Sequence, residues 1–100
     1  MEAIYQAKIN GRKVVGIKLA KSLARNPDLK VLRDIDTEKE IREGRTLLGY
    51  FQYTSTGCEV RVFGEGHFEY PTALVIDGTE DKVRKTKSGL LTAIGGLTLE

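Results

Sequence analysis

Hydrophobic and polar residues alternate on both sides of Asn10-Gly11, close to the start of the chain. Asn-Gly is a strong two-residue turn signal, because both central residues of a type I′ turn adopt positive φ. The pattern predicts a β-hairpin from Glu2 to Leu19, in which the two-residue loop fixes the register. The predicted cross-strand pairs are Ile9–Arg12, Lys8–Lys13, Ala7–Val14, Tyr5–Gly16 and Ile4–Ile17.

The period of the pattern changes after the hairpin. Leu19 and Leu23 fall on one face at helical spacing, which predicts a short helix from Leu19 to Arg25. Pro27 ends this helix, because proline disfavours the α-conformation of the residue before it. Strand-like alternation returns from Leu29 to Arg33.

Two later segments also carry helix signals. Thr37-x-x-Glu40 has the spacing of a capping box, so a short helix is predicted from Glu38 to Glu43. Residues 79–94 place apolar side chains on one helical stripe, and a helix is favoured there. A turn at Lys87-Ser88-Gly89 would instead make this segment a hairpin. The helical stripe consists of Val83, Leu90 and Ile94.

The clearest sheet pattern lies between residues 47 and 76, where six of the seven aromatic residues fall. It predicts a three-stranded meander over Leu47–Tyr53, Cys58–Phe63 and His67–Ile76. The first turn predicts the pairs Tyr53–Cys58, Phe51–Val60 and Gly49–Val62. A three-residue loop at 64–66 predicts the pairs Val62–Phe68, Arg61–Glu69 and Val60–Tyr70. Both registers place Val60 and Val62 on the buried face.

Length and composition fit one globular domain. The chain has 100 residues, of which 40% are hydrophobic and 30% charged, enough for one core without disulfides or metals. The predicted elements give an α+β fold: a small antiparallel β-sheet or open barrel of five or six strands with two or three short helices. We assign residues 1–98 to this domain, because Leu99-Glu100 resembles the scar that precedes a purification tag.

Cysteine usage and the N-terminal residues bear on the compartment. Cys58 is the only cysteine, so no internal disulfide can form, whereas secreted domains of this size usually carry several. The N-terminal residues lack the basic and apolar regions of a signal peptide. No apolar run reaches the roughly 18 residues that a membrane span needs. We therefore expect a cytoplasmic protein without a membrane partner.

The residue types that carry catalysis do not converge in the predicted fold. His67 is the only histidine, and the predicted hairpin separates it from Cys58 by about 16 Å, too far for proton transfer. Asp34, Asp36 and Glu38 alternate like cation ligands, but an acidic loop at a helix N-terminus explains the same residues. We expect no enzymatic activity, no cofactor and no metal.

Charge is distributed in three blocks along the chain. Residues 1–33 carry eight basic side chains and two acids, and residues 34–81 carry four basic side chains and eleven acids. Residues 82–100 carry four basic side chains and one acid. The blocks predict opposed charged faces unless folding mixes them.

The basic side chains of the first hairpin and helix form the candidate site. A basic hairpin beside a basic helix is typical of phosphate recognition, so we predict a non-enzymatic binding module that contacts nucleic acid. The opposition of Lys8 and Lys13 is mildly destabilising, which favours a role other than stability. The alternative is a solubilising surface whose lysines protect an edge strand. The candidate nucleic-acid-binding residues are Lys8, Arg12, Lys13, Lys21 and Arg25.

The C-terminal part of the chain supports a second hypothesis. Residues 89–99 are uncharged and include the large aliphatic residues Leu90, Leu91, Ile94 and Leu97. In a monomer this segment would cap the sheet, and in a homodimer it would be buried against a second copy. The second function class is therefore a protein-interaction or assembly subunit. A second basic cluster has the same two interpretations as the first and consists of Lys82, Arg84, Lys85 and Lys87.

Overall fold

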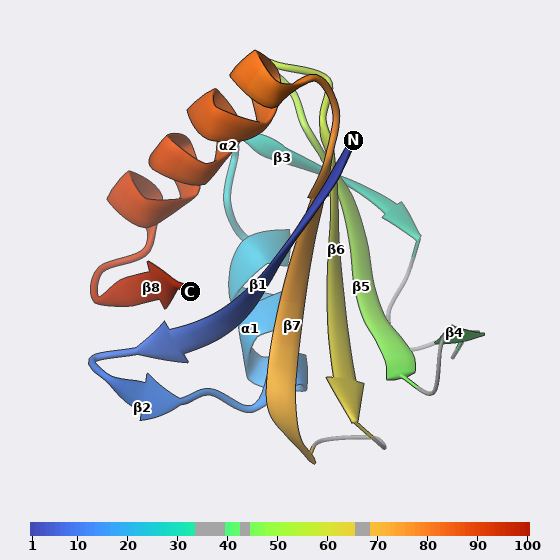
Figure 1. Cartoon of the computed structure of the whole chain (residues 1–100), viewed down its shortest axis with the longest axis vertical. Coiled ribbons are helices and arrows are strands. Elements are labelled where there is room, and N and C mark those ends of the chain that lie inside the picture. The colour runs from blue at the N-terminus through green and yellow to red at the C-terminus, as the bar shows by residue number, and fades with distance from the viewer. Residues whose placement is uncertain (34–39, 43–44, 66–68) are drawn as a thin grey trace.

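The computed structural model describes residues 1–33, 40–42, 45–65 and 69–100, which form an α+β domain with one antiparallel sheet (Figure 1). Its elements are β1 (Glu2–Ile9), β2 (Arg12–Lys13), α1 (Gly16–Ala24), β3 (Leu29–Arg33), β4 (Glu40–Arg42), β5 (Arg45–Tyr53), β6 (Glu59–Glu65), β7 (Glu69–Asp77), α2 (Glu80–Ala93) and β8 (Leu97–Leu99). The strand order is β2-β1-β7-β6-β5-β3, with β4 also paired to β5 and β8 to β1. The predicted α+β class and antiparallel sheet are confirmed, but the eight described strands exceed the predicted five or six.

The first hairpin keeps its predicted turn but is much shorter than predicted. Asn10 and Gly11 have φ of 53° and 74°, and Lys8 lies opposite Lys13. The predicted pairing of Tyr5 and Ile4 with the second arm is wrong, because β1 pairs there with β7. The chain leaves the sheet after β2 and enters α1 at Gly16, where an added Cβ would contact Leu48 at 2.6 Å.

Both described helices bury one apolar stripe. α1 begins three residues before the predicted start and buries Leu19, Ala20 and Leu23. α2 confirms the favoured helix over 79–94 and excludes the hairpin alternative, because Val83 and Leu90 pack into the core. Hydrophobic stripes at helical spacing therefore identified both helices, with an error only at the start of the first.

The predicted helix from Glu38 to Glu43 is wrong where the structure describes it. Glu40–Arg42 is strand β4, which pairs with the first residues of β5. Residues 34–39 and 43–44 lie outside the described part of the chain. A capping-box spacing is a local signal, and here an available sheet edge outweighs it.

The meander is present, with one register confirmed and one wrong. β5 and β6 pair as predicted, with Phe51 opposite Val60. β7 is displaced by six residues from its predicted pairing with β6, so that Val62 lies opposite Leu74 rather than Phe68. An even displacement keeps the same face buried, so the alternation of β6 could not distinguish the two registers. The register found buries the aliphatic run of β7 between β6 and β1.

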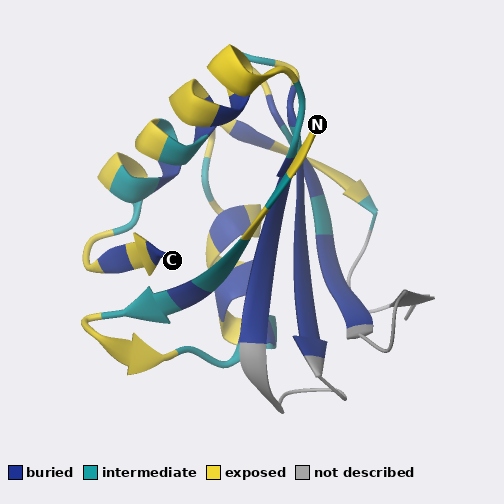
Figure 2. Cartoon of the chain, in the orientation of Figure 1, coloured by how far each residue is buried: buried dark blue, intermediate teal, exposed yellow. Residues whose placement is uncertain are grey.

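The two faces of the sheet have different surroundings. One face packs against both helices and holds the main core, where Phe51, Val60, Val62 and Leu74 are fully buried. α1 packs against β5, β6 and β7, and Figure 1 shows it behind β7, with α2 at the upper left. Figure 2 shows the buried positions running along the central strands and the inner sides of the helices. Neither described helix covers the other face, which we call the open face.

The C-terminal residues are part of this core. Leu90, Leu97 and Leu99 are buried, and β8 pairs with the end of β1. The backbone groups of Gln6 and Glu100 form two hydrogen bonds of 2.8 and 3.0 Å. Leu99 and Glu100, which the sequence analysis set apart, therefore extend the sheet edge. Of the described helices, neither is long and apolar enough to cross a membrane.

Candidate nucleic-acid interface

The exposed side of α1 carries three cations in one row, which we call the basic stripe. Lys18, Lys21 and Arg25 fall on one face at helical spacing, opposite the buried leucines of the same helix. At about 1.5 Å per residue the stripe extends roughly 10 Å along the axis. Within the described residues, no carboxylate lies within 4.0 Å of any of the three side chains. Their charge is therefore available to an external anion.

The hairpin adjoins one end of the basic stripe. Arg12 and Lys13 are exposed at the hairpin tip, which we define as residues 10–13. Lys13 and Lys18 line one groove of about 290 Å³ between the hairpin and α1. The floor of this groove is apolar and consists of Ile9, Val14, Val15 and Leu19. The structure thus brings the hairpin tip and the basic stripe onto adjoining surfaces.

Lys8 is separate from the other predicted site residues. It is half-buried, and its Nζ lies 3.2 Å from Glu100 Oε2. Its neighbour across the sheet on β8 is Thr98. Of the five predicted site residues, Arg12, Lys13, Lys21 and Arg25 are exposed, and Lys8 is half-buried and paired with Glu100.

The four cations of the second basic cluster lie on α2 and differ in their contacts. Arg84 lies 3.6 Å from Asp81 and 3.9 Å from Glu80. Lys87 lies over the ring of Tyr5, 4.7 Å from its centroid. The side chains of Lys82 and Lys85 are exposed, and neither has a described carboxylate within ion-pair distance.

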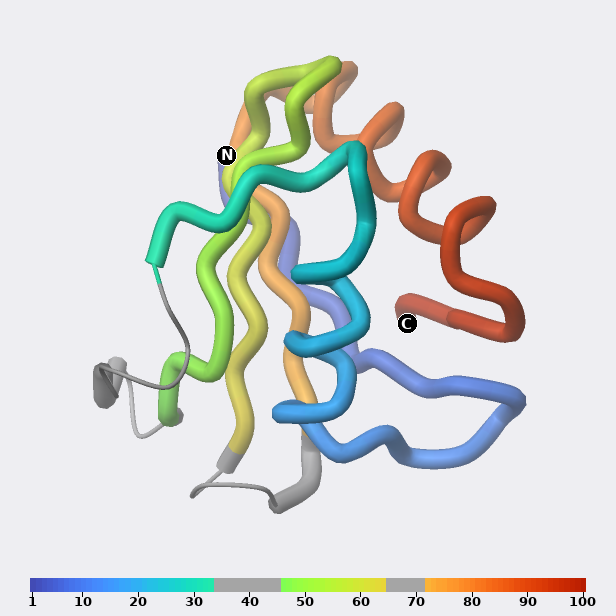
Figure 3. The backbone as a smooth tube through the Cα atoms, turned by 180° about the vertical axis from the view of Figure 1, so that it is seen from behind, coloured from blue at the N-terminus to red at the C-terminus, as the bar shows by residue number. Residues whose placement is uncertain are grey.

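A groove between the two helices was not foreseen from the sequence. It consists of two shallow hollows of about 500 and 330 Å³ that share Asp28 and Ala93, and we call the two together the groove. Figure 3 shows the end of α1, the turn that follows it and α2 on one side of the molecule. Arg25 lines one hollow and Lys85 the other. In the sequence, residues 26–28 indicate only the end of a helix, and no local signal joins them to α2.

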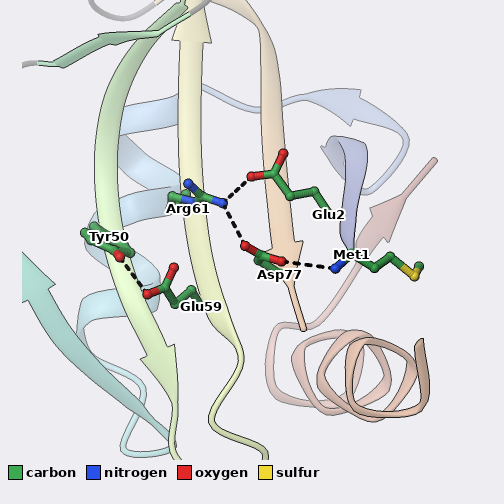
Figure 4. Close-up of polar contacts among 6 residues, drawn as sticks. All are labelled: Met1, Glu2, Tyr50, Glu59, Arg61 and Asp77. Atoms are coloured by element: carbon green, nitrogen blue, oxygen red, sulfur yellow. Dashed lines mark hydrogen bonds and ion pairs between the residues drawn. The ribbon is translucent and has the colours of Figure 1, made fainter. Parts of the chain in front are cut away.

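The open face carries a polar network that the predicted register also missed. Arg61 is 91% buried at its side chain, and its Nη2 lies 2.7 Å from Glu2 and 3.6 Å from Asp77 (Figure 4). Its Nε is enclosed without a hydrogen-bond partner. The predicted partner of Arg61 was Glu69, which lies four pairs away in the true register. Tyr50, on the same face, is half-buried and hydrogen-bonded to Glu59.

Residues considered for catalysis or metal binding give little further chemistry. Cys58 is buried, as expected for a core residue, and its thiol is free. His67, Asp34, Asp36 and Glu38 lie outside the described residues. Across the described ranges, no three His, Cys, Asp or Glu side chains gather closely enough to hold a metal ion.

Comparison with known proteins adds no assignment. No protein-family model, curated protein or solved structure matches the chain. Function must therefore be argued from the surfaces described above.

Proposed function

We propose that this chain is a non-enzymatic module that binds nucleic acid through the basic stripe and the hairpin tip. The observation that carries the proposal is the row formed by Lys18, Lys21 and Arg25, which has no described carboxylate within 4.0 Å. Cations that are not compensated within the protein can release counterions from a phosphate backbone, and this release drives non-specific binding.

Rigidity of the scaffold supports the same proposal. α1 is anchored by three fully buried residues, so its exposed cations project from a fixed helix rather than from a loose loop. The apolar floor between Lys13 and Lys18 offers a surface for the sugar or the base of a bound nucleotide. A positively charged surface beside apolar contact area suits a nucleic acid better than free phosphate.

The assembly alternative has weaker support. Leu90 and Leu97 are buried in the chain's own core, and Leu91 and Ile94 are partly buried against it. The aliphatic side chains that would contact a second copy are thus part of the core of the monomer. We therefore retain nucleic-acid binding as the single proposed function.

The salt dependence of binding tests the proposal. A labelled mixed-sequence oligonucleotide should bind at ~50 mM salt, with log affinity falling linearly with log salt concentration. Lys21→Glu should weaken binding and reduce the slope by about one phosphate contact. Lys30→Glu is the matched control, because Lys30 is exposed on β3 and pairs with Gln52 on the open face. Absence of binding at ~50 mM salt, or equal losses in both variants, would contradict the proposal.

A further inference from the structure

The groove between the helices has a defined order of charges. Arg25 lines one hollow, Lys85 lines the other, and Asp28 lines both. A phosphate would be attracted to either cation and repelled by the carboxylate between them. A ligand that suits the groove therefore carries negative charge at its ends and hydrogen-bond donors in the middle.

Asp28 is positioned to accept such donors. Its backbone N–H donates to Asn26 Oδ1 at 2.9 Å, and its carbonyl accepts from the Thr54 N–H at 2.9 Å and the Thr54 hydroxyl at 3.1 Å. These contacts fix the backbone on both sides of the residue. Its carboxylate is exposed and has no described partner. Asp28, an anchored residue whose carboxylate has two acceptor oxygens, thus lines both hollows.

Tyr53 supplies a second polar group on the groove wall. It is only 8% exposed, and its hydroxyl has no hydrogen-bond partner within the described chain. It is not among the fully enclosed polar atoms, so the hydroxyl still reaches the groove. Tyr53 lies opposite Leu29 in the β3–β5 ladder, and Leu29 directly follows Asp28 in the chain. A donor and a pair of acceptors therefore line the same hollow.

We propose that this groove binds an unpaired guanine of a single-stranded nucleic acid; the inference rests on the proposed function. Guanine presents two adjacent N–H donors and the O6 acceptor on its pairing edge. The two donors match the carboxylate of Asp28, and O6 can accept from the Tyr53 hydroxyl. The flanking phosphates would lie toward Arg25 and Lys85, and the strand would continue along the basic stripe.

Single strands are favoured over duplexes for a steric reason. The pairing edge of guanine is occupied in a duplex and becomes available only when the base is unstacked and turned outward. The larger hollow, about 500 Å³ in volume, is shallow and open to solvent, so an outward-turned base can reach it. Adenine, cytosine and thymine each present at most one donor position beside acceptors, which a carboxylate disfavours.

The test compares oligonucleotides that differ at one base. The protein is titrated into three labelled oligonucleotides at ~50 mM salt. The first is oligo(dT) with one central deoxyguanosine, the second has deoxyinosine at that position, and the third is oligo(dT) itself. Deoxyinosine removes only the exocyclic amino group, so guanosine should bind about tenfold more tightly than either of the others. Free GMP should bind much more weakly than the oligonucleotide, because it cannot reach the basic stripe. Equal binding of GMP would overturn a strand as the ligand.

Asp28→Asn separates base recognition from general electrostatics. It should abolish the preference for guanosine while leaving oligo(dT) affinity unchanged or raised, because a negative charge is removed. Asp81→Asn, an exposed residue on α2 outside the groove, is the matched control and should retain the preference. Equal binding of all oligonucleotides to the unmodified protein, with the Lys21→Glu loss intact, would overturn the guanine site but not the proposed function. No binding of any oligonucleotide would overturn both.

Discussion

The Tyr50 hydroxyl donates a hydrogen bond of 2.7 Å to Glu59 Oε1, between neighbouring strands on the open face (Figure 4). This bond is the main reason that the pKa of Tyr50 is raised above 10.0, with burial and the negative charge of Glu59 acting in the same direction. Arg61 and Arg33 act in the opposite direction and lower it. The open face thus carries a tyrosine that holds its proton more strongly than a free phenol.

Glu59→Gln should lower the pKa of Tyr50 toward its ordinary value, because the charged acceptor is lost. In the unmodified protein, the stabilisation from this pair is fully present below the unfolded pKa of about 10 and is lost as pH rises through the higher folded pKa. Ultraviolet titration of the tyrosines measures this change in pKa. Comparison with the Tyr50→Phe variant separates the signal of Tyr50 from that of the other tyrosines. Glu80→Gln, which removes an exposed carboxylate on α2, should leave the pKa of Tyr50 unaltered.

Arg61 is the one buried charged residue among those that the structure describes. Arg61→Ala should lower the free energy of unfolding by about 2 kcal/mol, since it loses the buried stem and the contacts to Glu2 and Asp77. The carboxylates are 41% and 36% exposed and can regain water, which keeps the loss below that of a fully buried pair. Arg61→Met should recover part of the lost free energy of unfolding, because the methionine side chain restores the packing of the stem and the enclosed Nε is absent. Urea denaturation measures both; a Met variant less stable than the Ala variant would contradict this account.

Gly89 allows α2 to approach the sheet. Replacing a mid-helix glycine by alanine usually stabilises by about 1 kcal/mol. Here an added Cβ would overlap the Tyr53 hydroxyl, so Gly89→Ala should destabilise the protein by roughly 1–3 kcal/mol. Ser88→Ala, an exposed neighbour on the same helix, should be neutral or slightly stabilising in thermal unfolding. Gly89→Ala combined with Tyr53→Phe should recover only part of the loss, because ring carbon Cζ would still lie 2.8 Å from the added Cβ.

Local patterns predicted most of the longer elements, but they missed the short strands β4 and β8. The Asn10-Gly11 turn, the strand over 29–33 and the β5–β6 register were all correct, because each depends on neighbouring residues or on a short loop. The stripes of α1 and α2 followed from helical spacing. The exposure of Lys21 and Arg25 also followed, since the opposite face of their helix had to be buried.

Pairings between distant segments were decided by the tertiary structure. Whether β1 pairs with β2 or β7, and whether Val62 meets Phe68 or Leu74, depends on total burial across the sheet, which alternation within one strand does not encode. For the same reason the sequence determined that Arg25, Asp28 and Lys85 are polar, but not that they line one groove. Their proximity depends on how α1 and α2 pack on a shared core, and that packing is a property of the whole chain.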